Sequence, residues 1–154
     1  MKAQFLILTV VASLTLAAQA SVFEIHAVEQ NRSDKTKAYT IDNAGRKVTV
    51  NLNNEVLIDR TALVSATSIV ETTGGKNDRK SVAELKLTFT NEGMRKVKEI
   101  TTAHVGKELG VLIDDQLIAT PVVREAPRGN SIMLTGNFSK AEADAMAAKI
   151  KKGK

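Results

Sequence analysis

The chain has 154 residues, of which 43% are hydrophobic and 25% are charged, values that are typical of a globular protein. Its net charge is +5, but aromatic residues make up only 3% and tryptophan is absent, so the chain lacks the stacking surface that binds nucleic-acid bases. The absence of cysteine excludes thiol catalysis, cysteine-ligated metals and disulfide bonds.

Residues 1–20 have the three parts of a secretory signal peptide. Lys2 supplies the positive charge, residues 5–18 are mainly apolar, and Ala18-Gln19-Ala20 has the small residues of a cleavage site. A membrane anchor is the alternative, but hydroxyl residues interrupt a short apolar stretch. We therefore predict cleavage after Ala20, export to the periplasm, and no stable membrane anchor afterwards.

Residues 21–57 are predicted to form a β-rich N-terminal segment. Phe23 and Ile25 alternate with Glu24 and His26, and "RKVTVNL" (46–52) alternates in the same way. This alternation predicts two strands, with His26 in an outward position on the first of them.

Residues 58–154 are predicted to form an α+β domain. "TALVSATSIVE" (61–71) predicts a short helical turn that leads into a strand, and "VAELKLTF" (82–89) has the alternation of a second strand. A helix is expected next, with Thr90 or Asn91 at its start, His104 near its end and Gly106 just beyond.

The last third of the chain predicts a hairpin, a strand and a final helix. Two apolar runs meet at Asp114-Asp115, "SIMLT" (131–135) is a strand, and "SKAE" (139–142) is a capping box that begins the helix. The order of elements favours a mostly antiparallel sheet with two helices on one face.

Few residues offer catalytic or metal-binding chemistry. Two histidines cannot supply the three or four ligands of a typical zinc site, and the sequence holds no nucleophile elbow or complete phosphate-binding loop. Asp114-Asp115 could be a pair of catalytic carboxylates, but adjacent strand residues point to opposite faces and aspartate favours turns. We therefore predict a turn there, and no catalytic, cofactor-binding or metal-binding residue.

Pro121 indicates where another chain could bind. Proline cannot donate to a sheet ladder, so its strand should lie at a sheet edge or carry a bulge. An edge strand can pair with a partner strand, although loops or the N-terminal segment could equally cover it. The candidate partner contacts are Leu117, Ala119, Thr120, Pro121 and Val123.

From residue 87 onward the chain resembles the first periplasmic domain of SecD, a membrane component of the bacterial protein-export machinery. The matching residues, in the family's order, are Phe89, Glu92-Gly93, Thr101, His104-Val105-Gly106-Lys107, Asp114-Asp115, Ala119-Thr120-Pro121, Gly129, Leu134-Thr135-Gly136, Phe138 and Glu142-Ala143. Asp115 and Asn130 stand where the family pattern has glycine, and both residue types tolerate the positive φ of such turns.

The resemblance implies a free-standing SecD-like domain with a ferredoxin-like fold that contacts polypeptide and catalyses no reaction. SecD itself is a polytopic membrane protein, whereas this sequence predicts no transmembrane helix after its signal peptide. We therefore expect a non-catalytic periplasmic domain that binds protein or peptide and assists export or folding. A periplasmic inhibitor or immunity-type protein for an exported hydrolase is the alternative, and an enzyme would lack converging catalytic groups.

Overall fold

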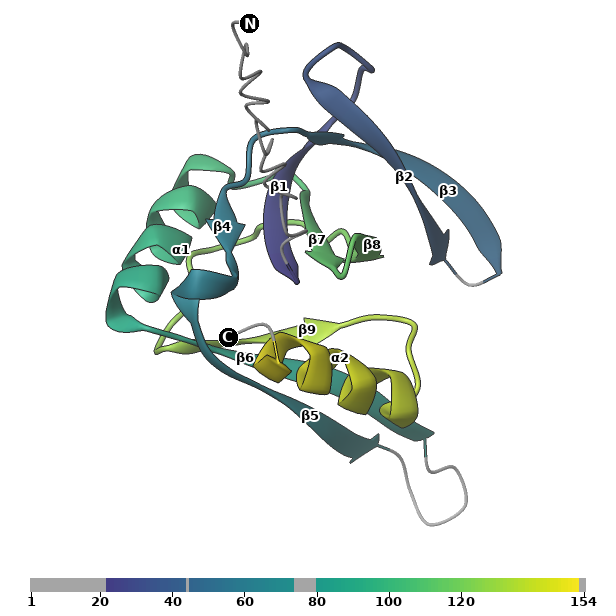
Figure 1. Ribbon diagram of the computed structural model, residues 1–154, viewed down its shortest axis with the longest axis vertical. Coiled ribbons are helices and arrows are strands. Elements are labelled where there is room, and N and C mark those ends of the chain that lie inside the picture. Colours follow the sequence, from purple (N-terminus) through teal and green to yellow (C-terminus); the bar gives the residue numbers. More distant parts are fainter. Residues whose placement is uncertain (1–21, 44, 74–79, 153–154) are drawn as a thin grey trace, which may run out of the picture.

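The computed structural model describes residues 22–43, 45–73 and 80–152, which form two antiparallel sheets and two helices (Figure 1). The predicted signal peptide lies outside the described residues. The larger sheet contains β1 (Phe23–Glu29), β2 (Thr36–Asn43), β3 (Arg46–Asn53), β4 (Ile58–Asp59), β7 (Leu109–Ile113) and β8 (Gln116–Ala119). The smaller sheet contains β5 (Leu63–Thr73), β6 (Lys80–Phe89) and β9 (Ser131–Thr135), and the helices are α1 (Asn91–Ala103), α2 (Lys140–Lys152) and the 3-10 helix η1 (Arg60–Ala62).

The larger sheet has the strand order β2-β3-β1-β7-β8, with β4 also paired to β1. All its pairs are antiparallel, and β1 lies in the middle, where Phe23 faces Ile113 and Ala27 faces Leu109 across the ladder with β7. The N-terminal segment therefore supplies the central strand of this sheet.

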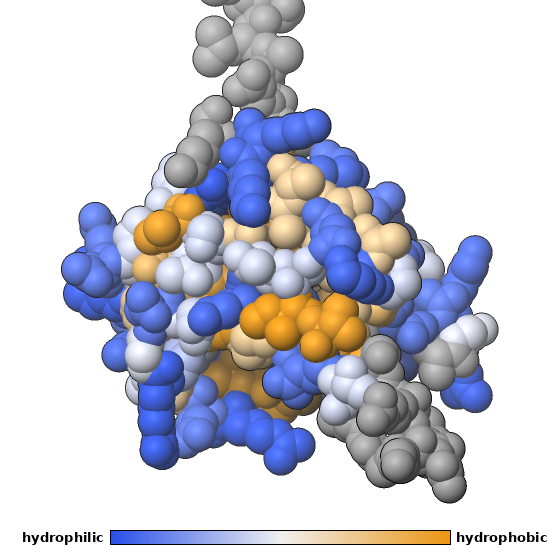
Figure 2. All heavy atoms as spheres, turned by 90° about the horizontal axis from the view of Figure 1, so that it is seen from below, coloured by the Kyte–Doolittle hydropathy of each residue, from blue (hydrophilic) through white to orange (hydrophobic). Residues whose placement is uncertain are grey.

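The smaller sheet has the order β5-β6-β9, and α2 packs on β5 and β6. Leu85 and Leu87 of β6 are fully buried, as the alternation in residues 82–89 predicts. Full burial of such a side chain stabilises the fold by about 2 to 3 kcal/mol. The opposite side of this sheet is mostly hydrophilic, with a small hydrophobic area near its centre (Figure 2).

The main hydrophobic core joins the two sheets and both helices. It includes Phe23 of β1, Leu85 of β6, Val97 of α1 and Ile150 of α2. A second, smaller cluster contains the buried Leu52, Leu112 and Leu117, with the partly buried Val28, Tyr39, Ile41 and Val50 packed against it. The larger sheet thus carries apolar side chains on both faces, because alternate strand residues point to opposite sides.

Both helices begin at the predicted caps. The Thr90 hydroxyl accepts a hydrogen bond of 2.9 Å from the Gly93 amide at the start of α1. At α2, the Ser139 amide donates to the Glu142 carboxylate at 2.7 Å, and the Glu142 amide donates back to the Ser139 hydroxyl at 3.3 Å. The capping box at residues 139–142 is therefore confirmed.

These contacts predict that acid weakens the attachment of α2. The hydrogen bonds from Ser139 lower the pKa of Glu142, and those from Lys140 and Ser68 lower the pKa of Asp144. Such a carboxyl, with a lower pKa in the folded state than in the unfolded state, stabilises the fold at any pH above its unfolded-state pKa. This stabilisation is lost as the pH falls through the folded-state pKa. We expect Glu142→Gln to lower the melting temperature at pH 7, and the difference from the wild type to shrink as the pH falls below the ordinary glutamate pKa of about 4.3. A difference in melting temperature that stays constant across this range would contradict the assignment.

The predicted α+β class, with antiparallel strands and two helices, is confirmed. The strands divide between two sheets, however, where the sequence suggested a single ferredoxin-like sheet with both helices on one face. Because β1 occupies one edge of β7 and β8 the other, β7 cannot join the sheet of β5, β6 and β9. The helices separate as well: α2 packs on β5 and β6, and α1 packs on η1, β4 and β6. Among the described residues, no helix is both long enough and apolar enough to cross a membrane.

Candidate functional site

The hairpin of β7 and β8 turns at Asp114-Asp115. Both residues have positive φ, 54° and 61°, and Ile113 pairs with Gln116 on either side of them. A type I′ turn, which matches the twist of the strands it joins, requires positive φ at both central residues of a two-residue loop. The turn predicted from the sequence is therefore confirmed. The Asp114 carboxylate binds the Lys149 ammonium of α2 at 2.5 Å, which ties the turn to the helix.

Strand β8 is the last strand of the larger sheet, as the position of Pro121 predicted. Its ladder with β7 shifts register between Val111 and Leu112, so Leu117 packs in the smaller cluster whereas Ala119 packs in the main core. Beyond Ala119 the chain still follows the start of β7: the Leu109 amide donates to the Pro121 carbonyl at 3.0 Å. The segment from Gln116 onward therefore has one backbone edge paired to the sheet and the other directed away from it.

A groove of about 1000 Å³ lies beside β8. Strand β2 forms one wall, α2 forms another, and residues 135–138 close it on the side of the smaller sheet. Apolar and charged side chains both line it, among them Tyr39, Ile41, Phe138 and Met146, together with Lys37, Asp115 and Glu142. A groove with this mixture fits a ligand that has both apolar and polar groups.

A cation stands at the start of β2. The Lys37 ammonium lies 5.0 Å from the centroid of the Tyr39 ring. Tyr39 raises the pKa of Lys37, against a smaller effect of burial, and the charges of Asp115 and Glu24 act in the same direction as Tyr39. Lys37 therefore keeps its positive charge at this end of the groove.

A second cavity of about 310 Å³ adjoins the groove. It lies between α1, residues 121–127 and β9, and its lining is mostly apolar, including Val97, Val111 and Leu134. Pro121 and Thr135 line both hollows, so the two are neighbours at this point.

The structure places all five predicted contact residues at these hollows. Leu117, Ala119 and Thr120 line the groove, Val123 lines the smaller cavity, and Pro121 lines both. Leu117, Ala119 and Val123 are only 7 to 8% exposed, so they support the floor. The backbone, Thr120 and the exposed Pro121 remain for contact.

Sequence reasoning missed the two other walls of the groove. The alternation of Tyr39 and Ile41 in residues 36–43 indicates a strand, and Ala145 and Met146 stand on a helix that was predicted. No local pattern shows that these elements meet β8.

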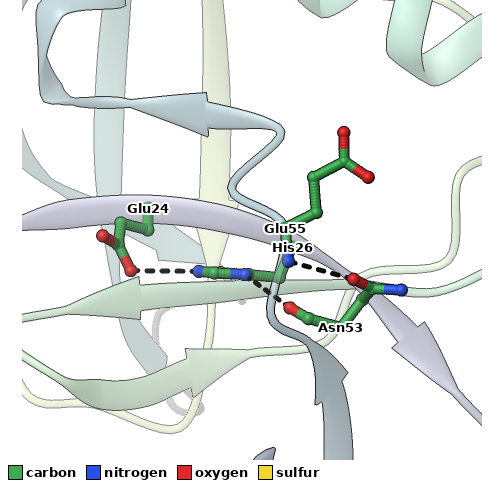
Figure 3. A network of polar contacts seen from close by, with 4 residues as sticks. All are labelled: Glu24, His26, Asn53 and Glu55. Carbon is green, nitrogen blue, oxygen red and sulfur yellow. Dashed lines mark hydrogen bonds and ion pairs between the residues drawn. The ribbon is translucent and has the colours of Figure 1, made fainter. Parts of the chain in front are cut away.

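His26 is buried, although an outward position was predicted (Figure 3). Its Nδ1 lies 2.8 Å from the Asn53 carbonyl oxygen and its Nε2 lies 3.0 Å from the Glu24 carboxylate. The prediction assumed that this face of β1 meets solvent, but the His26 side chain contacts Asn53 at the end of β3 and is only 5% exposed. Because a carbonyl only accepts, Nδ1 is the donor in the contact with Asn53. The His26–Asn53 hydrogen bond links β1 to the end of β3.

The remaining polar groups support structure as well. His104 ends α1, and its Nδ1 donates to the Ile100 carbonyl at 2.8 Å, as expected of a residue near a helix C-terminus. Within residues 22–43, 45–73 and 80–152, no three histidine or acidic side chains stand close enough together to hold a metal ion.

The fold and the groove define a class of small α+β domain in which an edge strand lines an open groove. The family model of the SecDF P1 head subdomain matches residues 44–154. The chain therefore belongs to the SecDF P1 head subdomain family.

The relatives in this family are subunits of protein translocases. The chain is 34% identical to SecDF of Thermus thermophilus over 70 residues, which are 46% of this chain and 10% of that protein. It is 33% identical to SecD of Rickettsia conorii over 76 residues, 49% of this chain and 15% of the relative. SecD of Syntrophobacter fumaroxidans is 25% identical over 118 residues, 77% of this chain and 22% of the relative. The chain thus spans 10% to 22% of the length of these relatives.

Solved structures show the same fold. SecDF in its super-membrane-facing form matches with a TM-score of 0.60 and 21% identity, over 86% of this chain and 19% of that one. A second structure, of "a membrane component SecDF that enhances protein export", gives the same score and identity over 86% of this chain and 63% of that one. The likeness at this identity establishes the fold.

Proposed function

We propose that this protein is a non-catalytic SecD-like domain that binds extended polypeptide in the periplasm and assists protein export or folding. The predicted signal peptide supports the location. Its relatives are protein translocase subunits, and one structural neighbour is described as a component that enhances protein export. Both support a polypeptide as the ligand.

The observation that carries the proposal is the free edge of β8 beside the groove. A strand at the end of a sheet presents unpaired backbone amides and carbonyls, which an extended chain can bind whatever its sequence. The walls add apolar side chains, including Phe138 and Met146, for a segment that has not yet folded. The exposed Pro121 ends the regular strand and limits uncontrolled pairing along this edge.

Two matched substitutions of alanine by glutamate on α2 test the proposal. Ala145 and Ala148 are both exposed, but only Ala145 lines the groove. We expect the purified protein to bind a fluorescent, permanently unfolded protein, and Ala145→Glu to weaken this binding by about tenfold, equivalent to about 1.4 kcal/mol. The reason is that the added carboxylate would be desolvated by the bound chain. Ala148→Glu should bind like the wild type.

Fluorescence anisotropy provides the measurement, and the unlabelled, natively folded parent of the unfolded probe is the competitor that should fail to displace it. Equal weakening by both substitutions would place the contact elsewhere on α2. An absence of saturable binding to the unfolded protein would refute the function itself.

A further inference from the structure

We propose that the groove receives one extended polypeptide segment as an added strand between β8 and β2, antiparallel to both. This rests on the proposed function and specifies how the same site holds its ligand. The ligand is then held along two backbone edges, not along β8 alone.

The strand order leaves two free edges that lie close together. β2 and β8 stand at opposite ends of the order β2-β3-β1-β7-β8, yet some of their Cα atoms lie within 8 Å of each other. The larger sheet therefore curls toward closure. We call the gap between the free edges of β2 and β8 the seam, and the part of the chain that the structure describes contains no strand pairing across it.

Direction explains why one added strand suits the seam. Each neighbour in the order is antiparallel to the next, so β2 and β8 run the same way, four steps apart. Direct pairing of β2 with β8 would be parallel, whereas one strand inserted between them can be antiparallel to both and complete an antiparallel barrel.

The charges at one end of the seam agree with this alignment. Lys37 near the start of β2 interacts electrostatically with Asp115, which immediately precedes β8. Asn43 at the end of β2 and Thr120 just after β8 line the same groove. The two strands thus present corresponding ends to one ligand.

Hairpin geometry identifies backbone groups that face the seam. In a two-residue hairpin the pair flanking the turn exchanges hydrogen bonds, and the next pair directs its amides and carbonyls outward. In β8 the outward residue is Leu117, opposite Leu112. In the β2–β3 hairpin, the pair next to the turn is Asn43–Arg46. The amides and carbonyls of alternate β2 residues, including Thr40, therefore point away from β3.

The two faces of an inserted strand would meet different side chains. One face would lie toward Tyr39, Ile41 and Leu117, which belong to the smaller hydrophobic cluster. The other would lie toward Phe138 and Met146. The ligand chemistry is therefore an extended segment with apolar side chains, because both faces offer apolar contacts.

The seam must widen slightly to admit a strand. Neighbouring strands lie about 4.8 Å apart, so an inserted strand requires about 9.6 Å between β2 and β8. The ladder between the β2–β3 hairpin and β1 has two residue pairs, Val28–Leu52 and Glu29–Asn51, and the His26–Asn53 hydrogen bond and the buried Leu52 add to this attachment. The insertion therefore requires β2 to move outward while the contacts of β3 with β1 hold.

Backbone methylation of the ligand tests the insertion with the unaltered protein. The probe is an apolar peptide of about seven residues, compared with two forms that are N-methylated at its odd or at its even residues. Each form removes the donors from one edge of the extended peptide. A ligand that pairs on both edges should lose about tenfold or more in affinity in both forms.

The outcomes separate the two proposals. If one methylated form binds as well as the parent peptide, the ligand pairs along a single edge and the insertion is refuted, while the proposed function stands. If both forms bind as well as the parent peptide, backbone pairing plays no part and the insertion fails. If the parent peptide does not bind, the insertion fails together with the proposed function.

A proline in β2 gives an independent check on the protein. Thr40→Pro removes an amide that faces the seam without removing one from the ladder with β3, whereas Thr40→Ala keeps it. We expect Thr40→Pro alone to weaken peptide binding by about tenfold, with circular dichroism confirming that both variants are folded. Equal affinity of the two folded variants would refute a contact with β2.

Discussion

Arg60→Ala is expected to lower the free energy of unfolding by about 3 kcal/mol. Arg60 is only 9% exposed, and its Nε donates to the Ile150 carbonyl at 2.6 Å while Nη1 donates to the Leu63 carbonyl at 2.8 Å. Ile150 lies in the last turn of α2, where the helix dipole favours a cation. Removing the guanidinium leaves these carbonyls without their charged donor. The end of α2, one wall of the groove, would then loosen.

Two further substitutions at Arg60 separate the hydrogen bonds from the cost of burying the charge. Arg60→Lys keeps the charge but lacks the planar fork that reaches two carbonyls, so we expect an intermediate loss of stability. Arg60→Met removes the charge and keeps the volume. In urea unfolding, a Met variant as stable as the wild type would mean that desolvation outweighs the hydrogen bonds, and would contradict the account.

Gly93→Ala is expected to destabilise the protein by about 2 kcal/mol, although alanine is the better helix former. A Cβ at Gly93 would lie 2.3 Å from the Ala62 carbonyl oxygen and 2.9 Å from the Ala62 Cβ. That carbonyl also accepts the Thr90 amide at 2.9 Å, so backbone atoms of η1 and α1 would have to separate.

Thermal unfolding measures this effect against a neighbouring control. Arg95→Ala changes an exposed residue on the same helix and should stay within about 0.5 kcal/mol of the wild type. A Gly93→Ala variant more stable than the wild type would show that helix propensity dominates and that η1 yields easily.

Much of the local structure could be predicted from the sequence. The alternation in residues 82–89, the strand at residues 131–135 and the capping box at residues 139–142 each depend on neighbours a few residues apart. Such patterns act through side-chain direction and local hydrogen bonds, and are therefore visible in a single sequence.

The arrangement of these elements could not be predicted in the same way. β1 pairs with β7 across more than eighty residues, and this pairing divides the strands between two sheets. The burial of Arg60 and His26 follows from that arrangement, since neither residue type is usually inside. The groove has the same origin: Pro121 indicated the edge strand, but β2 and α2 reach it only in the folded protein.

Amide hydrogen exchange at Leu117 tests the central claim, that the free edge of β8 binds extended polypeptide. Leu85, in the middle of β6 and paired on both sides, provides the internal reference. At saturating unfolded ligand, we predict that exchange of the Leu117 amide slows by about tenfold or more, while exchange at Leu85 is unchanged. Saturable binding that leaves exchange at Leu117 unchanged would contradict the claim.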